Sequence, residues 1–212
     1  MLRIIAGRNR GRRLQTAPGG DVRPTAERVR EAIFNKLTHG LVADGGAPLT
    51  GVHVADIFAG SGAMAFEALS RGAMSVSVVE NNPKALALIG RNARTLDDED
   101  RLTFVLRDAT APGPPPQPCQ LLFLDAPYRS DLSAAALTAL ATEGWCAQGA
   151  VATVEVAADE DLAPPTAFAF LEERRYGAAK IVFLRGPGSL GFGGMPQRVP
   201  IQSQLRANVH RL

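Results

Sequence analysis

Four acidic side chains stand at or near the ends of apolar runs, where carboxylates can bind a ligand. They are Asp56 in VADIF, Glu80 in SVVE, Asp108 in LRDA and Asp125 in LFLDAPY. A carboxylate can accept hydrogen bonds from hydroxyl and amine groups and can balance a positive charge. Each acid taken singly is an ordinary cap of a strand end. If the runs are neighbouring parallel strands, the four acids predict a cleft at the carboxyl edge of the sheet.

A glycine pattern lies between the first of these runs and a helical segment. Gly60, Gly62 and Ala65 form G-x-G-x-x-A, and Glu80 follows Gly60 by twenty residues. Glycines at this point let the backbone turn tightly and approach a ligand at the start of the helix. A carboxylate after the next strand can accept hydrogen bonds from both hydroxyls of a ribose. The pattern therefore predicts a nucleoside cofactor and leaves NAD and S-adenosylmethionine open.

Asp56 favours S-adenosylmethionine of these two cofactors. A negative charge just before the glycines would repel a pyrophosphate, whereas it would attract a sulfonium and an ammonium group. Asp108 is placed to bind the amino group of an adenine. The competing interpretation is a glycine turn with a capping acid and no ligand.

Residues 125–128, DAPY, combine a carboxylate with an aromatic ring. The exocyclic amine of a purine is a poor nucleophile, so a site that methylates it must orient it and stabilise the developing positive charge. Asp125 can accept hydrogen bonds from such an amine, Tyr128 can stack on the base, and Pro127 stiffens the backbone between them. The alternative is a simple Asp-x-Pro turn after a strand.

Alternating strand and helix patterns are expected to position these side chains. Strands are predicted at 51–58, 74–80, 101–109, 119–127 and 149–157, and helices at 62–72, 82–96 and 131–145. This alternation predicts a parallel sheet with helices on both faces. Residues 168–185 hold two more strands with only a short turn between them, so these should pair antiparallel. The expected fold is α/β, a Rossmann-like, doubly wound, mostly parallel sheet of seven strands.

Shorter segments flank the predicted sheet. LRIIAG and RNRGRRL predict a small hairpin, and RPTAERVREAIFNKL predicts an amphipathic helix with Thr25 as its N-cap. From residue 186 onward glycine, proline and polar residues dominate without periodicity, which predicts disorder. We expect an N-terminal extension (1–40), a cofactor-binding domain (41–185) and a disordered tail (186–212).

Basic residues gather at the two ends of the chain. Residues 1–40 hold nine Lys/Arg against three acids, residues 41–185 eleven against eighteen, and residues 186–212 three against none. Five arginines fall within the first thirteen positions, where guanidinium groups can pair with phosphates. A solvated, flexible arm is the other interpretation of the same charges.

The composition limits which classes of protein the chain can belong to. With 212 residues, 46% of them hydrophobic, the chain suits one globular domain. Cys119 and Cys146 are too few for a disulfide framework or a zinc site, and the three histidines are scattered, so no metal is expected. There is no signal-peptide core and no apolar run near the roughly 18 residues of a membrane span, which predicts a cytoplasmic protein.

The motifs DIFAGSGAMAFEALSRGA, VVENNPKAL, RDA and LDAPY together resemble class I S-adenosylmethionine-dependent methyltransferases that act on exocyclic amines. With RIIAGRNRGRRL, RPTAERVREAIFNKL and RRYGAAKIVFLR, the chain is similar to RsmD, the bacterial 16S ribosomal RNA guanine-N2 methyltransferase family. The resemblance covers residues 2 to about 185. Ala126 departs from the family's Asp-Pro-Pro-Tyr motif, which lowers the expected rigidity of this segment rather than altering its chemistry.

The resemblance implies methyl transfer from S-adenosylmethionine to a guanine N2 amine of small-subunit ribosomal RNA, either naked or in an assembled particle, by a monomer. The expected catalytic residues are Asp125, Pro127 and Tyr128. The expected cofactor residues are Asp56, Gly60, Ser61, Gly62, Glu80, Asn81, Asp108 and Ala109. The expected RNA-binding residues are Arg8, Arg10, Arg12, Arg13, Arg23, Thr25 and Arg28.

Other functions remain open at this point. They are an NAD-dependent dehydrogenase, a methyltransferase for another RNA or DNA amine, and an RNA-binding module without activity. Arg28 in particular has an alternative role in an ion pair with Glu31 on its own helix.

Overall fold

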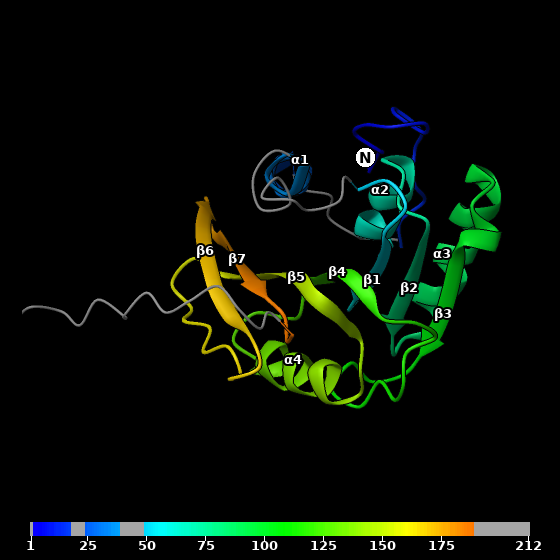
Figure 1. The fold of residues 1–212 in the computed structure, drawn as a ribbon. Coiled ribbons are helices and arrows are strands. Elements are labelled where there is room, and N and C mark those ends of the chain that lie inside the picture. Colours follow the sequence, from blue (N-terminus) through cyan, green and yellow to red (C-terminus); the bar gives the residue numbers. More distant parts are fainter. Residues whose placement is uncertain (1, 18–23, 39–48, 189–212) are drawn as a thin grey trace, which may run out of the picture.

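The apolar runs form one seven-stranded sheet in a computed structural model that describes residues 2–17, 24–38 and 49–188. The strand order is β3-β2-β1-β4-β5-β7-β6 (Figure 1). The strands are β1 (His53–Ile57), β2 (Ser75–Glu80), β3 (Leu102–Leu106), β4 (Cys119–Leu124), β5 (Cys146–Ala157), β6 (Ala169–Tyr176) and β7 (Ala179–Arg185). β1 to β5 pair parallel, whereas β7 runs antiparallel to β5 and β6. The predicted fold class is confirmed.

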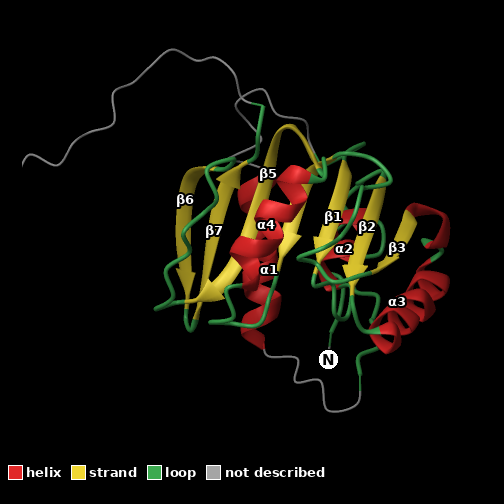
Figure 2. Ribbon diagram, turned by 90° about the horizontal axis from the view of Figure 1, so that it is seen from below, coloured by secondary structure: helices red, strands yellow, loops and turns green. Residues whose placement is uncertain are grey.

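Helices cover both faces of this sheet (Figure 2). They are α1 (Pro24–Lys36), α2 (Ala63–Ser70), α3 (Pro83–Leu96) and α4 (Leu132–Thr142). A single turn of 3-10 helix, η2 (Glu99–Arg101), follows α3. Buried residues of α1, α2 and α3 pack in one hydrophobic cluster, and those of α4 pack in a second cluster on the opposite face.

The alternation of side chains along the strands divides the core between these faces. In β7, Ile181 and Phe183 belong to the cluster under α1 to α3, whereas Val182 and Leu184 belong to the cluster with α4. The same period of two fixes the direction of polar side chains at the strand ends. A side chain two positions after a residue of the cluster under α1 to α3, on the same strand, therefore points towards those helices.

Several boundaries differ from the sequence predictions, and two of the differences have a clear physical cause. Helix α1 begins at Pro24, so Thr25 lies inside its first turn and the predicted N-cap is wrong. Proline suits the first helical position because its fixed φ is helical and its missing N–H has no partner there. β5 begins at Cys146 rather than at 149, because Cys119 pairs with Cys146 before a register shift in the β4–β5 ladder. Arg23 and most of the predicted tail, 189–212, lie outside the described residues.

The N-terminal segment, residues 2–17, forms the predicted hairpin and packs on α2. Arg3 and Arg13 make an antiparallel bridge, and the backbone N–H of Leu14 donates to the carbonyl of Leu2. Oxygens of buried Glu67 accept hydrogen bonds from the backbone N–H groups of Ile5 and Ala6, at 2.8 and 3.1 Å. The interpretation of this segment as a flexible arm is therefore wrong for residues 2–17.

Candidate active site

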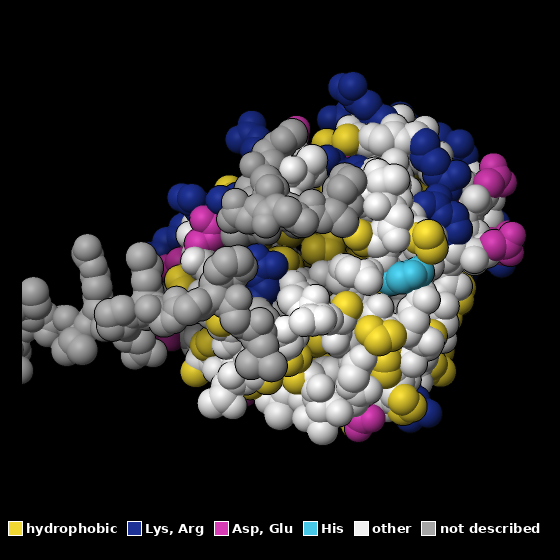
Figure 3. Space-filling model, viewed as in Figure 1, with side chains coloured by type: hydrophobic (Ala, Val, Ile, Leu, Met, Phe, Trp, Pro, Cys, Tyr) yellow, Lys and Arg dark blue, Asp and Glu magenta, His cyan; other side chains and the backbone are white. Residues whose placement is uncertain are grey.

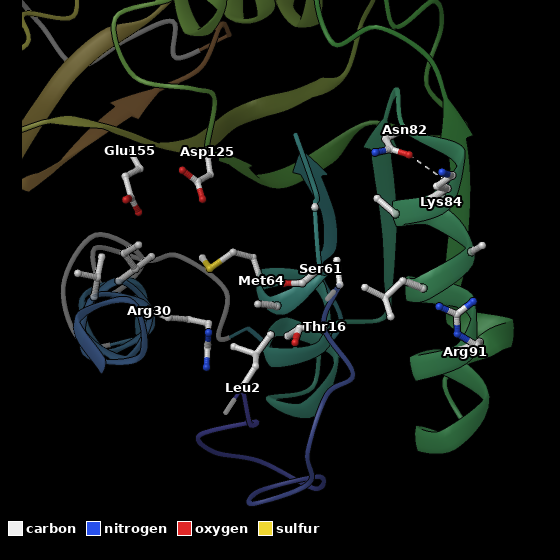
Figure 4. Close-up of a pocket in the computed structure, with 18 residues that line it drawn as sticks. Leu2, Thr16, Arg30, Ser61, Met64, Asn82, Lys84, Arg91, Asp125 and Glu155 are labelled. Carbon is white, nitrogen blue, oxygen red and sulfur yellow. Dashed lines mark hydrogen bonds between the residues drawn. The ribbon is translucent and has the colours of Figure 1, made fainter. Parts of the chain in front are cut away.

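A pocket of about 850 Å³ opens between the N-terminal segment, α1, α2 and α3 (Figure 4). Gly60 and Ser61 of the glycine pattern line it, as does Asp125. Met64 and Arg30 add an apolar and a cationic side chain to its wall. The structure thus brings the glycine loop and the carboxylate of DAPY to one pocket. Of the four acids predicted to surround a cleft, Asp125 lines this pocket, whereas Asp56, Glu80 and Asp108 do not.

Gly62 allows the glycine loop to pass close to α3. Its φ is +74°, and a Cβ built on it would lie 3.1 Å from side-chain atoms of Ile89 and Phe66. A larger residue would push α2 and α3 apart at the point where the loop enters α2. The loop therefore requires a residue without a side chain at position 62.

Glu80 holds the glycine loop against the start of α3. Its Oε2 accepts a 2.9 Å hydrogen bond from the backbone N–H of Gly60, and its Oε1 accepts one of 2.9 Å from that of Asn82. A carboxylate oxygen has more than one lone pair, so both oxygens retain acceptor capacity. Glu80 therefore orders the loop in addition to the ribose contact predicted for it.

Asp56 is a buried residue on the face of β1 that is covered by α2. Its Oδ2 accepts a 3.0 Å hydrogen bond from the backbone N–H of Ala65, in the first turn of α2. Desolvation by burial, supplemented by the charges of Asp125 and Glu80, raises the pKa of Asp56 to about 8, against the opposing effect of the Ala65 N–H. Asp56 thus caps α2, and its contact with a cofactor stays a prediction.

Of the other predicted cofactor residues, two are exposed and one is buried. Asp108 is exposed, and hydrogen bonds from the backbone N–H and hydroxyl of Thr110 lower its pKa. Ala109 is buried in the cluster with α4, and Asn81 is exposed. Its neighbour Asn82, which the sequence analysis did not select, lines the pocket and caps α3 by accepting from the backbone N–H of Lys84. The signal was an Asn directly before a Pro at a helix start.

Asp125 follows β4 and points into the pocket. It lies two residues beyond Phe123, a member of the cluster under α1 to α3, so its carboxylate emerges on that face. The carboxylate is exposed to the pocket while protein atoms crowd it on its other sides. Desolvation by these atoms, followed by the charge of Glu155, raises the pKa of Asp125 to about 7.

The rest of DAPY forms an exposed turn beside this carboxylate. Ala126 is buried, whereas Pro127 and Tyr128 are exposed, with 39% of Tyr128 accessible. The Tyr128 hydroxyl donates a 2.6 Å hydrogen bond to Oε1 of Glu155. The ring remains accessible for the stacking role that the sequence predicted, and the hydroxyl has a partner that the sequence did not reveal.

Glu155 is a site residue that sequence reasoning missed. It lies on β5 and lines the pocket together with Asp125. The only local signal was an acid inside the apolar strand VATVEVA. Figure 4 shows the two carboxylates side by side at one rim of the pocket.

The predicted RNA-binding arginines divide into tethered and open groups. The guanidinium of Arg8 bonds to buried Asp98, and that of Arg12 donates to the carbonyl of Thr95 at the end of α3. Arg10 and Arg13 are exposed, and no ion pair of theirs occurs within the described ranges. Figure 3 shows Lys and Arg side chains gathered over this end of the molecule.

The remaining two described positions lie on α1. Arg28 is exposed, and the alternative ion pair with Glu31 does not form, although both side chains are described. Of Thr25 only the helical backbone is described, so its RNA contact stays a prediction.

Arg30 and Glu67 join α1 to the N-terminal segment below the pocket. The Arg30 guanidinium donates a 2.7 Å hydrogen bond to the carbonyl of Arg3 and lies 3.8 Å from a Glu67 oxygen. Burial lowers the pKa of Arg30, and the charge of Glu67 opposes this shift most strongly. Because both residues are buried, their pairing fixes the wall of the pocket that α1 supplies.

The residues that the structure describes contain neither a metal-binding cluster nor a membrane-spanning helix. No group of three or more His, Cys, Asp or Glu is arranged to hold a metal ion there. No helix in the same part of the chain is long and apolar enough to cross a membrane.

The sequence and the fold have counterparts in known proteins. A family model described as Conserved hypothetical protein 95 matches residues 2–185. The chain is 32% identical over 183 residues to Ribosomal RNA small subunit methyltransferase D of Haemophilus influenzae, covering 83% of this chain and 89% of that protein. It is 32% identical over 161 residues to the protein of the same name from Escherichia coli, covering 73% and 74%.

A solved structure has a similar fold. The putative methyltransferase yhhF from Escherichia coli superimposes with a TM-score of 0.73 at 28% identity, covering 88% of this chain and 98% of that one. Because the family model extends from the N-terminal segment to the end of β7, this chain belongs to the Conserved hypothetical protein 95 family, the RsmD-type methyltransferases that its motifs resemble.

Proposed function

We propose that this protein transfers a methyl group from S-adenosylmethionine to the exocyclic N2 amine of a guanine in small-subunit (16S) ribosomal RNA. The observation that carries the proposal is that Asp125 and the glycine loop share one pocket. A carboxylate suited to an amine therefore lies beside a loop suited to a nucleoside cofactor. The names of the Haemophilus and Escherichia relatives support ribosomal RNA as the substrate class.

The residues around the glycine loop fit S-adenosylmethionine. Gly60 and Ser61 line the pocket, Glu80 retains acceptor capacity for ribose hydroxyls, and exposed Asp108 offers a carboxylate to the adenine amino group. When bound, this cofactor supplies an activated methyl group on a sulfonium. A cation of this kind near Asp56 and Asp125 would favour their charged forms, which burial alone disfavours.

Asp125 is suited to hold the amine that receives the methyl group. Its carboxylate can accept hydrogen bonds from the amine, and these bonds strengthen as positive charge develops on the nitrogen. A pKa of about 7 also lets Asp125 take up the proton that the amine loses and release it to solvent. The role requires the base to be turned out of its stack, and the accessible ring of Tyr128 offers a surface to hold it.

Exposed arginines supply a surface for the phosphate backbone. Arg10 and Arg13 project from the hairpin, whereas Arg8 and Arg12 anchor it to the body of the protein. In this proposal residues at the edge of the sheet bind the base, while the hairpin binds the phosphates and positions the RNA.

The protein acts in the cytoplasm, where ribosomal subunits are found, and it acts as a monomer.

Thermal unfolding with added ligands tests the cofactor assignment. A ligand that binds only the folded state, present at about 100 times its Kd, raises stability by about 2.7 kcal/mol. We expect S-adenosylhomocysteine to raise the Tm and NAD to leave it unchanged. Glu80→Ala should remove most of the shift. A shift with NAD and none with S-adenosylhomocysteine would return the protein to the dehydrogenase interpretation.

Methyl transfer from labelled S-adenosylmethionine tests the substrate. Naked small-subunit RNA, assembled small-subunit particles and DNA are offered in parallel, and the modified nucleoside is identified by mass spectrometry. We expect N2-methylguanosine in ribosomal RNA. Methylation of another amine, or of DNA alone, would contradict the proposal.

A further inference from the structure

Asp125 and Glu155 form a pair of neighbouring carboxylates at the rim of the pocket. β4 and β5 run parallel with Leu124 opposite Val154, so the next residue on each strand is Asp125 and Glu155. Both side chains point to the face covered by α1 and both line the pocket (Figure 4). The charge of Glu155 contributes to the raised pKa of Asp125, as expected for side chains at this spacing.

Two acids at this position need partners that donate hydrogen bonds. A phosphate or a carbonyl would be repelled by them, whereas the N–H groups of a base would be bound. In the proposed reaction Asp125 accepts the hydrogen bond from the amine that is methylated. Glu155 is a second acceptor beside it, and the proposed reaction does not require it to bind that amine.

The hydrogen bond from Tyr128 fixes which part of Glu155 faces the ligand. It uses Oε1, so the same carboxylate retains Oε2 as an acceptor. A side chain with one oxygen tethered loses less rotamer entropy when it binds a ligand through the other. Tyr128 thus orients Glu155 as well as presenting its ring.

We propose that Glu155 is the specificity-determining residue for guanine and accepts a hydrogen bond from its N1–H while Asp125 accepts from the N2 amine. This inference rests on the proposed function. Guanine presents N1–H and the N2 amine side by side on its Watson–Crick edge. Adenine and cytosine instead place an unprotonated ring nitrogen next to their amine, and that lone pair would face the Glu155 carboxylate.

The analogue 2-aminopurine separates the two contacts. It keeps the amine that receives the methyl group, but its N1 is an acceptor and carries no hydrogen. A site built to hydrogen-bond a substrate group rejects an analogue that lacks it, because the buried partner is left unpaired. We expect the unaltered protein to methylate guanine at least about 100-fold more efficiently than 2-aminopurine at the same position of the RNA.

Glu155→Gln should reverse much of this discrimination. The Gln oxygen can keep the hydrogen bond from Tyr128, which leaves the amide NH₂ facing the pocket, where it can donate to N1 of 2-aminopurine. The measurement is kcat/KM for both bases, placed at the nucleotide that the unaltered protein methylates. We expect the guanine to 2-aminopurine ratio to fall by about 10-fold or more.

Two variants serve as controls, one for the loss of a negative charge and one for the loss of the hydrogen bond that orients Glu155. Asp159→Asn removes one nearby negative charge from an exposed residue paired with Arg129 and should leave the ratio unchanged. Tyr128→Phe keeps the Glu155 carboxylate and should lower the rate while still preferring guanine. An unchanged ratio in Glu155→Gln, in a protein that methylates guanine, overturns this inference alone. Failure of the unaltered protein to methylate guanine N2 overturns the proposed function and this inference with it.

Discussion

The Tyr128 hydroxyl donates a 2.6 Å hydrogen bond to Oε1 of Glu155, so the ring expected to stack on the base also positions a carboxylate. From the sequence alone, Phe is an adequate replacement for a stacking Tyr. The structure leads to a different expectation. Tyr128→Phe should lower kcat roughly 10-fold, because Glu155 loses a charge-assisted hydrogen bond.

Tyr128→Ala should lower kcat further and also raise KM for RNA, since the stacking surface is lost as well. Steady-state kinetics with ribosomal RNA separate these two effects. Equal activity of the Phe variant and the unaltered protein would show that the hydroxyl has no part in the reaction.

The raised pKa of Asp125 predicts a pH dependence. The carboxylate form accepts the hydrogen bond from the amine, so activity should fall as the pH drops through about 7, where Asp125 becomes protonated. Burial contributes most to this shift and Glu155 contributes next. Glu155→Gln should therefore move the acidic limb of the kcat/KM profile to lower pH. A limb in the same position would show that the two carboxylates do not interact.

The fold was predictable because each of its signals is local. Alternating apolar runs and helical patterns gave the parallel strands. The short turn near Tyr176 and Gly177, which the structure places at Gly177 and Ala178, gave the antiparallel pair. Glu80 was predictable because its spacing from Gly60 is a property of one strand–helix–strand unit. These features depend on neighbours within about 20 to 30 residues, which a sequence displays directly.

The missed residues depend on contacts between distant segments. Glu67 reads as an ordinary helix residue, yet it accepts hydrogen bonds from Ile5 and Ala6, about sixty positions away. Glu155 acquires its role only when β5 pairs beside β4 and Tyr128 returns to it. The charges of Arg8 and Arg12 predicted an exposed arm because the sequence gave no sign of their partners on and after α3.

Gly7 and Gly11 provide a matched test of how tightly the N-terminal segment packs. Both have positive φ, +83° and +81°, but a Cβ on Gly7 would lie 1.9 Å from the Ser70 carbonyl oxygen, whereas one on Gly11 meets nothing within 4 Å. Gly11→Ala should cost about 1 kcal/mol in backbone strain alone. Gly7→Ala should cost about 3 kcal/mol or more, because the segment must also shift from α2.

Urea unfolding gives both free energies, and limited proteolysis shows whether the N-terminal segment is released. Equal losses for the two variants would mean that contact with Ser70 contributes little to stability.

The open arginines predict a salt-dependent contribution to RNA binding. Arg10→Gln combined with Arg13→Gln should weaken binding and reduce the slope of log K against log salt by about one unit per lost phosphate contact. Arg174→Gln, on β6 at the far edge of the sheet, is the control and should leave the slope unchanged (Figure 1). Filter binding at several salt concentrations measures the slope. An unaltered slope in the double variant would remove the hairpin from the RNA-binding surface.

The role of Asp125 is the central claim, and one comparison tests it most directly. Small-subunit RNA or particles are incubated with labelled S-adenosylmethionine and either the unaltered protein or Asp125→Ala, and N2-methylguanosine is quantified by mass spectrometry. Binding of S-adenosylhomocysteine is measured on the same samples. We predict that Asp125→Ala loses on the order of 100-fold or more in turnover with cofactor affinity nearly unchanged, because its hydrogen bond strengthens in the transition state. Near-normal N2-methylguanosine formation by Asp125→Ala would contradict the account and leave this carboxylate as a cap on the end of β4.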